Sequence, residues 1–145
     1  MAPPFAYFDT SVVVKRYVLE ASSTMARTLL RRYRCLSSAI LPVEVISALT
    51  RRRAAGDVAA ATFALISSRL AEDRGHWELV PLTGPLLALA ENLVRRHLLR
   101  TLDAIHLAAA LTFRDSSGLR VPFVTADTRQ REAAEPAGLP ILWAG

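Results

Sequence analysis

Four acidic residues stand where a carboxylate can do chemistry. Asp9 and Asp127 each follow a short apolar run, and Glu44 and Asp103 each fall in the first turn of a predicted helix. Capping of free backbone N–H groups explains any one of them taken alone. Taken together, four carboxylates predict an all-oxygen site that selects Mg²⁺ or Mn²⁺. Such an ion activates water and neutralises charge on a phosphate, so the set predicts hydrolysis of a phosphodiester.

The elements that would position these acids alternate along the chain. Short apolar runs predict strands at residues 5–8, 34–38, 77–82, 121–125 and 139–143. Helical periodicity predicts helices at 12–17, 22–34, 42–55, 57–75, 84–97, 101–113 and 127–137, with a loop at 114–120. The predicted helix caps include Asp57 and Thr101. Strands that alternate with helices indicate an α/β domain whose parallel sheet is covered on both faces.

A parallel sheet would bring the acids together. The carboxyl ends of its strands and the N-terminal ends of the following helices lie along one edge. We therefore expect Asp9, Glu44, Asp103 and Asp127 to face one cleft. At an effective dielectric of about 20, two charges about 5 Å apart repel by roughly 3 kcal/mol. Such a cluster requires protonation or a bound cation.

The composition indicates a folded chain. Its 145 residues are 52% apolar, which suits a single domain over residues 1–145. The net charge of +5 comes almost wholly from arginine, since Lys15 is the only lysine. This favours a polyanionic partner, or else reflects a coding bias that raises Arg and Ala together. The single cysteine, Cys35, predicts a cytoplasmic setting without an internal disulfide, and no run predicts a signal peptide or membrane span.

Four stretches resemble, in order and spacing, the motifs of PIN-domain proteins. They are residues 7–15 (YFDTSVVVK), 42–49 (PVEVISAL), 102–111 (LDAIHLAAAL) and 124–127 (VTAD). Within that family the likeness is to the short VapC-type toxins of bacterial toxin–antitoxin pairs, and it covers nearly the whole chain. The resemblance implies a three-layer α/β/α fold around a mainly parallel sheet of four to five strands. It also implies an endoribonuclease that depends on one or two Mg²⁺ or Mn²⁺ ions.

The resemblance assigns the metal to the four acids. Asp9 and Asp103 would be the principal ligands. Glu44 and Asp127 would bind directly or through water, help to place a second ion, and orient or deprotonate the attacking water. The partners implied are RNA, a small cognate antitoxin that blocks the cleft, and a second copy of the chain in a homodimer.

Two further groups of side chains are candidates for contact with RNA. The hydroxyl-bearing candidates, which would lie near the pocket or contact phosphate, are Thr10, Ser11 and Thr125. Hydroxyls at such turns also commonly cap or turn the backbone. The basic candidates for RNA phosphates are Lys15, Arg16 and Arg51. Cations at solvated helix ends that complement the dipole explain the arginine cluster around Arg51 as well.

Some alternatives remain open at the level of sequence. His106 follows Asp103 by three positions, which would suit a metal or acid–base pair, but a helix histidine with a local hydrogen bond also explains it. A catalytically silent PIN-like module that binds RNA or a protein would carry the same motifs. A receiver-type phospho-acceptor domain also gathers acids at a sheet edge, but this chain has one acid after its first strand and none after residues 77–82.

Overall fold

The computed structural model describes residues 2–145 and contains one five-stranded sheet. The strands are β1 (Phe5–Phe8), β2 (Arg34–Ser38), β3 (Glu78–Val80), β4 (Phe123–Thr125) and β5 (Ile141–Trp143). Their order across the sheet is β3-β2-β1-β4-β5, and every neighbouring pair is parallel. The predicted parallel sheet is therefore confirmed, with β1 at its centre.

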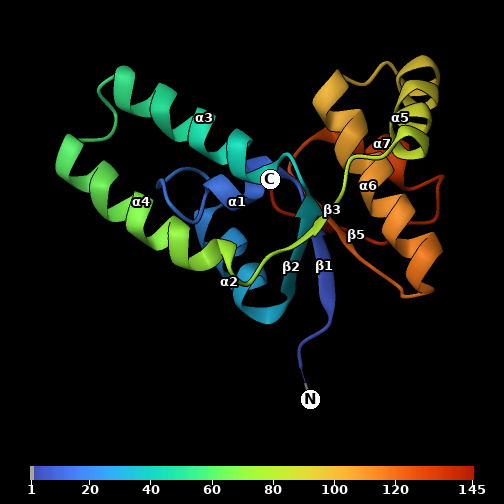
Figure 1. Cartoon of the computed structure of the whole chain (residues 1–145), viewed down its shortest axis with the longest axis horizontal. Helices are drawn as coiled ribbons and strands as arrows, with labels where there is room; N and C mark the ends of the chain where they lie inside the picture. The colour runs from blue at the N-terminus through green and yellow to red at the C-terminus, as the bar shows by residue number, and fades with distance from the viewer. Residues whose placement is uncertain (1) are drawn as a thin grey trace.

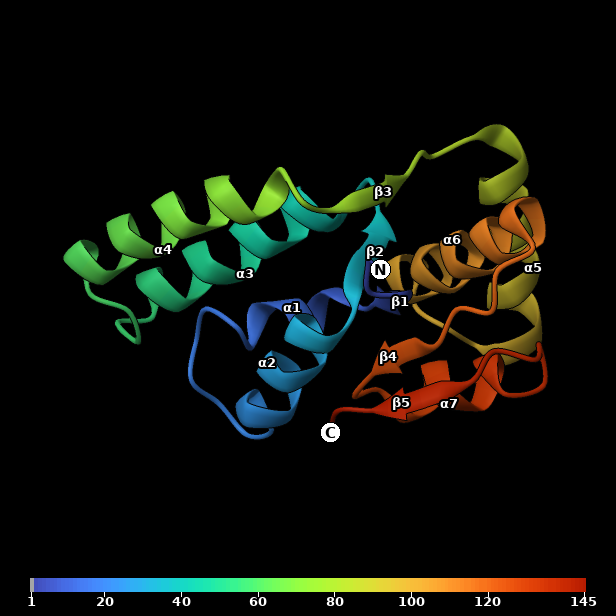
Figure 2. The same cartoon turned by 90° about the horizontal axis from the view of Figure 1, so that it is seen from below.

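Seven helices within residues 2–145 cover the sheet. They are α1 (Thr10–Val14), α2 (Ser23–Arg32), α3 (Leu41–Ala54), α4 (Ala60–Arg74), α5 (Gly84–His97), α6 (Thr101–Ser117) and α7 (Thr128–Ala134). In Figure 1, α1 to α4 lie on one side of the strands and α5 to α7 on the other. Figure 2 shows α3 and α4 running side by side, away from the sheet. This arrangement confirms the predicted α/β/α layers.

Strand β1 holds the two layers together because its side chains alternate between two cores. Ala6 and Phe8 belong to the core beneath α1 to α4, and Tyr7 belongs to the core beneath α5 to α7. All three side chains are fully buried. A strand that is buried on both faces carries apolar residues without polar alternation, which is why residues 5–8 read as a continuous apolar run.

Several predicted element boundaries are wrong. Helix α1 spans Thr10–Val14 rather than 12–17, and α7 ends at Ala134 rather than at 137. Asp57 does not cap α4, whose N-cap is Ala59. The N–H of Asp57 instead donates to the carbonyl of Arg52 after the left-handed Gly56 (φ 84°), so Asp57 belongs to the end of α3. Residue 101 is the first residue of α6, not its cap.

The predicted loop at 114–120 begins too early, because α6 continues to Ser117. The C-cap of α6 is Gly118, whose φ of 70° lies in the left-handed region that favours glycine. Within residues 2–145, no helix combines the length and apolar character that crossing a bilayer requires.

Candidate active site

The four predicted acids line one pocket of about 650 Å³ at the carboxyl edge of the sheet. Asp9 follows β1 and is the N-cap of α1, whereas Asp127 follows β4 and is the N-cap of α7. Glu44 and Asp103 lie in the first turns of α3 and α6. Asp9 and Asp127 therefore each cap a helix and also line the shared pocket. The sequence had offered these two roles as separate explanations.

Both carboxylate oxygens of Asp9 accept hydrogen bonds. Its Oδ2 accepts from the N–H of Ser11 at 3.2 Å and from the Ser11 hydroxyl. Its Oδ1 accepts from Nε2 of Gln130 at 3.1 Å. Only 6% of Asp9 is exposed, so these donors replace most of the water that a free carboxylate would have.

Glu44 belongs to a network of hydrogen bonds that joins α3 and α1 on one side of the sheet to α6 on the other. The hydroxyl of Thr10 donates to Oε1 of Glu44 at 2.6 Å, and Nε2 of His106 lies 2.7 Å from the same oxygen. On the other side of its ring, Nδ1 of His106 lies 2.8 Å from the hydroxyl of Tyr7. Nε2 of His106 also lies 2.9 Å from the hydroxyl of Thr10. The hydrogen bonds of His106 thus reach β1, α1 and α3, and the local hydrogen bond expected for this histidine is not what the structure shows.

The neighbours of His106 shift its pKa. Burial lowers the pKa of His106, but its hydrogen bond to Glu44 and the negative charges of Asp9, Glu44 and Asp103 outweigh burial, so the pKa is raised above its ordinary value. When both ring nitrogens carry a proton, Nε2 donates towards Glu44 and Nδ1 donates to the Tyr7 hydroxyl. The neighbouring acids therefore favour the cationic form of this buried histidine.

The pKa of Asp103 reflects the mutual repulsion of the acids. Burial and the charges of Asp9 and Asp127 raise the pKa of Asp103 from 3.8 to about 6. A cation in the pocket would relieve this repulsion, and carboxylates are the oxygen donors that Mg²⁺ and Mn²⁺ prefer. The donor chemistry therefore fits a hard divalent ion. As they lie, however, no three His, Cys, Asp or Glu side chains among residues 2–145 form a ready-made cluster for an ion.

The predicted hydroxyl residues lie at two depths. Thr10 and Ser11 line the pocket. Thr125 is fully buried behind it, where its Oγ1 accepts from the N–H of Asp127 at 3.0 Å and donates to Oε1 of Gln130 at 2.6 Å. Each of the three hydroxyls therefore contacts an acid. Thr10 donates to Glu44, Ser11 donates to Asp9, and Thr125 accepts from the N–H of Asp127.

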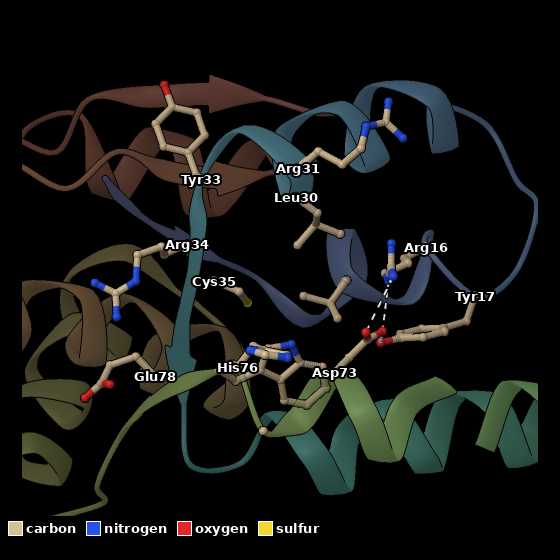
Figure 3. Close-up of a pocket in the computed structure, with 13 residues that line it drawn as sticks. Arg16, Tyr17, Leu30, Arg31, Tyr33, Arg34, Cys35, Asp73, His76 and Glu78 are labelled. Atoms are coloured by element: carbon tan, nitrogen blue, oxygen red, sulfur yellow. Dashed lines mark hydrogen bonds and ion pairs between the residues drawn. The ribbon is translucent and has the colours of Figure 1, made fainter. Parts of the chain in front are cut away.

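The predicted basic residues divide between two pockets. Lys15 and Arg51 line the acidic pocket, as do Arg52 and Arg100. Arg16 lines a second pocket of about 520 Å³ between α1, α2 and α4, where its Nε lies 2.9 Å from Asp73 (Figure 3). Lys15 and Arg51 thus line the same pocket as the acids, whereas Arg16 pairs with Asp73 in the second pocket.

Gln130 is a residue of the site that the sequence did not single out. It lies in α7 one turn after Asp127 and is fully buried. The available signal was its spacing, because residues three apart on a helix share a face. A polar side chain on the pocket face of a helix that begins at an acid would have been a reasonable candidate.

The comparisons with known proteins agree with this fold. The model of the PIN domain family matches residues 6–136. The chain therefore belongs to the PIN-domain family.

Its similarity within the family is to VapC proteins. Ribonuclease VapC45 of Mycobacterium tuberculosis is 36% identical over 143 residues, covering 93% of this chain and 92% of that protein. Ribonuclease VapC46 of the same species is 35% identical over 139 residues, covering 94% and 95%. These relatives place the chain among the VapC-type members.

A solved structure shares the fold. It is described as a toxin–antitoxin complex from Klebsiella pneumoniae, and it superposes with a TM-score of 0.67 at 17% identity. The match covers 97% of this chain and 98% of the other.

Proposed function

We propose that this chain is an endoribonuclease that depends on Mg²⁺ or Mn²⁺ and acts as the toxin of a toxin–antitoxin pair. The observation that carries the proposal is the meeting of Asp9, Glu44, Asp103 and Asp127 in one pocket, where the neighbouring acids contribute to the raised pKa of Asp103. The names of the relatives, Ribonuclease VapC45 and VapC46, support the same activity.

The acids would hold the metal, with Asp9 and Asp103 as principal ligands and Glu44 and Asp127 beside them. The bound ion would supply an activated water and neutralise charge on the phosphate. The protein's own contribution is to hold the carboxylates in place. Ser11 and Gln130 fix Asp9, and Thr10 and His106 fix Glu44.

Basic side chains at the pocket would bind the substrate. Lys15, Arg51 and Arg100 line the same pocket as the acids. Guanidinium and ammonium groups bind phosphate oxygens by charge-assisted hydrogen bonds, whatever the base sequence. Contacts of this kind would draw the backbone of an RNA across the carboxylates.

The proposed partner is a small antitoxin that covers this pocket, and the proposed assembly includes a homodimer. The similar fold of the Klebsiella pneumoniae structure, which is a toxin–antitoxin complex, supports a protein partner. A small open reading frame that overlaps the start of the gene would encode it. The cytoplasmic setting stays a prediction from the single cysteine.

RNA cleavage by the purified chain tests the activity. We expect cleavage with Mg²⁺ or Mn²⁺, none with EDTA, and loss of cleavage in Asp9→Asn and Asp103→Asn. Asp115→Asn is the matched control, since Asp115 is exposed and pairs only with its neighbour Arg114. A folded wild type that leaves RNA intact in the absence of any inhibitor contradicts the proposal. Equal cleavage by all variants would identify a contaminating nuclease.

A catalytically silent RNA-binding or partner-binding module is the second candidate. The observation that favours it is that no three acids among residues 2–145 stand ready to hold an ion. Such a module would bind a short RNA in fluorescence anisotropy as tightly with EDTA as with Mg²⁺, and it would never shorten the RNA.

A further inference from the structure

The side chain of Gln130 is polar, uncharged and fully buried at the edge of the acidic pocket. A buried amide is costly unless its donors and its acceptor are all paired. Its Oε1 accepts from the hydroxyl of Thr125 at 2.6 Å. Its Nε2 donates to Oδ1 of Asp9 at 3.1 Å and lies 3.4 Å from the carbonyl and 3.5 Å from Oδ1 of Asp103. One amide therefore spans the two acids proposed as principal ligands.

The orientation of the amide is fixed by its hydrogen-bonding partners. The Oγ1 of Thr125 accepts from the N–H of Asp127, so the single hydroxyl proton of Thr125 is free to donate to Oε1 of Gln130. With its oxygen turned to Thr125, the amide must turn its NH₂ group to Asp9 and Asp103. The reverse orientation would place an oxygen against two carboxylates.

Gln130 also contacts a third acid through its backbone. Its N–H donates to Oδ1 of Asp127 at 3.0 Å, the capping bond of α7. The start of α7 thus joins Asp9, Asp103 and Asp127 through one residue. A neutral donor between like charges reduces their repulsion without adding a cation that would compete for the site of a metal ion.

We propose that Gln130 is a positioning residue, which holds the carboxylates of Asp9 and Asp103 next to each other at the pocket, where they would bind the metal ion. This inference rests on the proposed function of the pocket. Partners behind the ligands of a metal commonly change its affinity 10- to 100-fold when they are removed, because they fix ligand orientation. A merely structural Gln130 would affect folding and leave the affinity of the folded protein for metal unchanged.

The first test is Gln130→Met, which keeps the length of the side chain and removes all its hydrogen bonds. Mn²⁺ affinity is measured by titration calorimetry on protein shown to be folded by circular dichroism. We expect a dissociation constant roughly 10- to 100-fold higher than that of the wild type. In RNA cleavage, the Mn²⁺ concentration for half-maximal rate should rise by a larger factor than the maximal rate falls. Glu132→Gln, on the exposed side of α7, is the control and should match the wild type.

A second pair of variants decides the matter if Gln130→Met fails to fold. Thr125→Val removes the hydroxyl that orients the amide, and Thr125→Ser keeps it. We expect weaker Mn²⁺ binding in Thr125→Val and wild-type binding in Thr125→Ser. Wild-type Mn²⁺ affinity in a folded Gln130→Met, or in Thr125→Val, overturns the inference.

Nuclear magnetic resonance offers a readout that needs no catalysis. Gln130 is the only glutamine in the chain and Asn92 the only asparagine, so the chain has two side-chain amide pairs. Addition of Mg²⁺ should shift the Gln130 pair and leave the pair of Asn92, an exposed residue of α5, unchanged. If the wild type binds Mn²⁺ and cleaves RNA but Gln130→Met behaves like it, only the role of Gln130 fails. If the wild type neither binds Mn²⁺ nor cleaves RNA, the proposed function fails and this inference fails with it.

Discussion

Asp103→Asn should stabilise the protein in the absence of metal, although it should abolish cleavage. The pKa of Asp103 is raised from 3.8 to about 6 by burial and by the charges of Asp9 and Asp127. An acid with a raised pKa binds protons more tightly in the folded state, so its contribution to stability falls as pH rises from about 4 to about 6. Above pH 6 the ionised carboxylate opposes folding, and asparagine removes that cost.

The size of the effect follows from the pKa difference. About two pKa units correspond to roughly 3 kcal/mol. Asp103 is only half-buried, and solvent screening reduces this to roughly 1–2 kcal/mol. For a chain of this length we expect Asp103→Asn to raise the melting temperature at pH 7.5 by roughly 3–6 °C.

Thermal melts in EDTA, followed by circular dichroism, measure this gain. At pH 4.5 the gain should fall to less than half, because the folded wild type is then protonated at Asp103. The control is Asp115→Asn, which removes an exposed charge outside the pocket and should leave the melting temperature unchanged. No gain in Asp103→Asn at pH 7.5, or a gain as large at pH 4.5, would refute the idea that the acids oppose folding.

Three further predictions concern other parts of the molecule. Burial raises the pKa of Cys35 to about 12, so iodoacetamide at pH 8 should leave the native protein unmodified and alkylate it in urea, as read by mass spectrometry. Tyr7→Phe should lower the free energy of unfolding in urea by about 1–3 kcal/mol, because it leaves Nδ1 of the buried His106 unpaired; an unchanged value would contradict the geometry of that bond. Arg51→Ala should weaken RNA binding and reduce its salt dependence by about one phosphate contact, whereas Arg16→Ala should leave both unchanged; the reverse result would mean that the second pocket binds RNA.

The sequence was sufficient to predict features that depend on local pattern. The central position of β1 followed from its unbroken apolar run, and the place of Asp9 followed from the end of that run. The meeting of four acids in one pocket followed from a general property of parallel sheets. None of these inferences requires knowledge of which side chains touch.

The sequence was not sufficient where a role depends on pairing across the chain. Tyr7 and His106 are 99 positions apart, and Gln130 and Asp9 are 121 apart. Lys15 and Arg16 are adjacent, yet the backbone after α1 turns one to the acids and the other to Asp73. The start of α4 was missed because Asp57 still belongs to the turn that closes α3 after the left-handed Gly56, two residues before the N-cap of α4 at Ala59.

The pocket draws its acids from both ends of a long stretch of chain, residues 9 to 127, and this has a consequence during protein synthesis. A ribosome adds Asp9, Glu44 and Asp103 to the nascent chain before it adds Asp127 and Gln130. Strand β4, which pairs with β1 and carries these residues to the pocket, is also made late. A ribosome that stops anywhere before residue 127 therefore releases a product that lacks both Asp127 and Gln130, so the full set of acids exists only after most of the message has been translated.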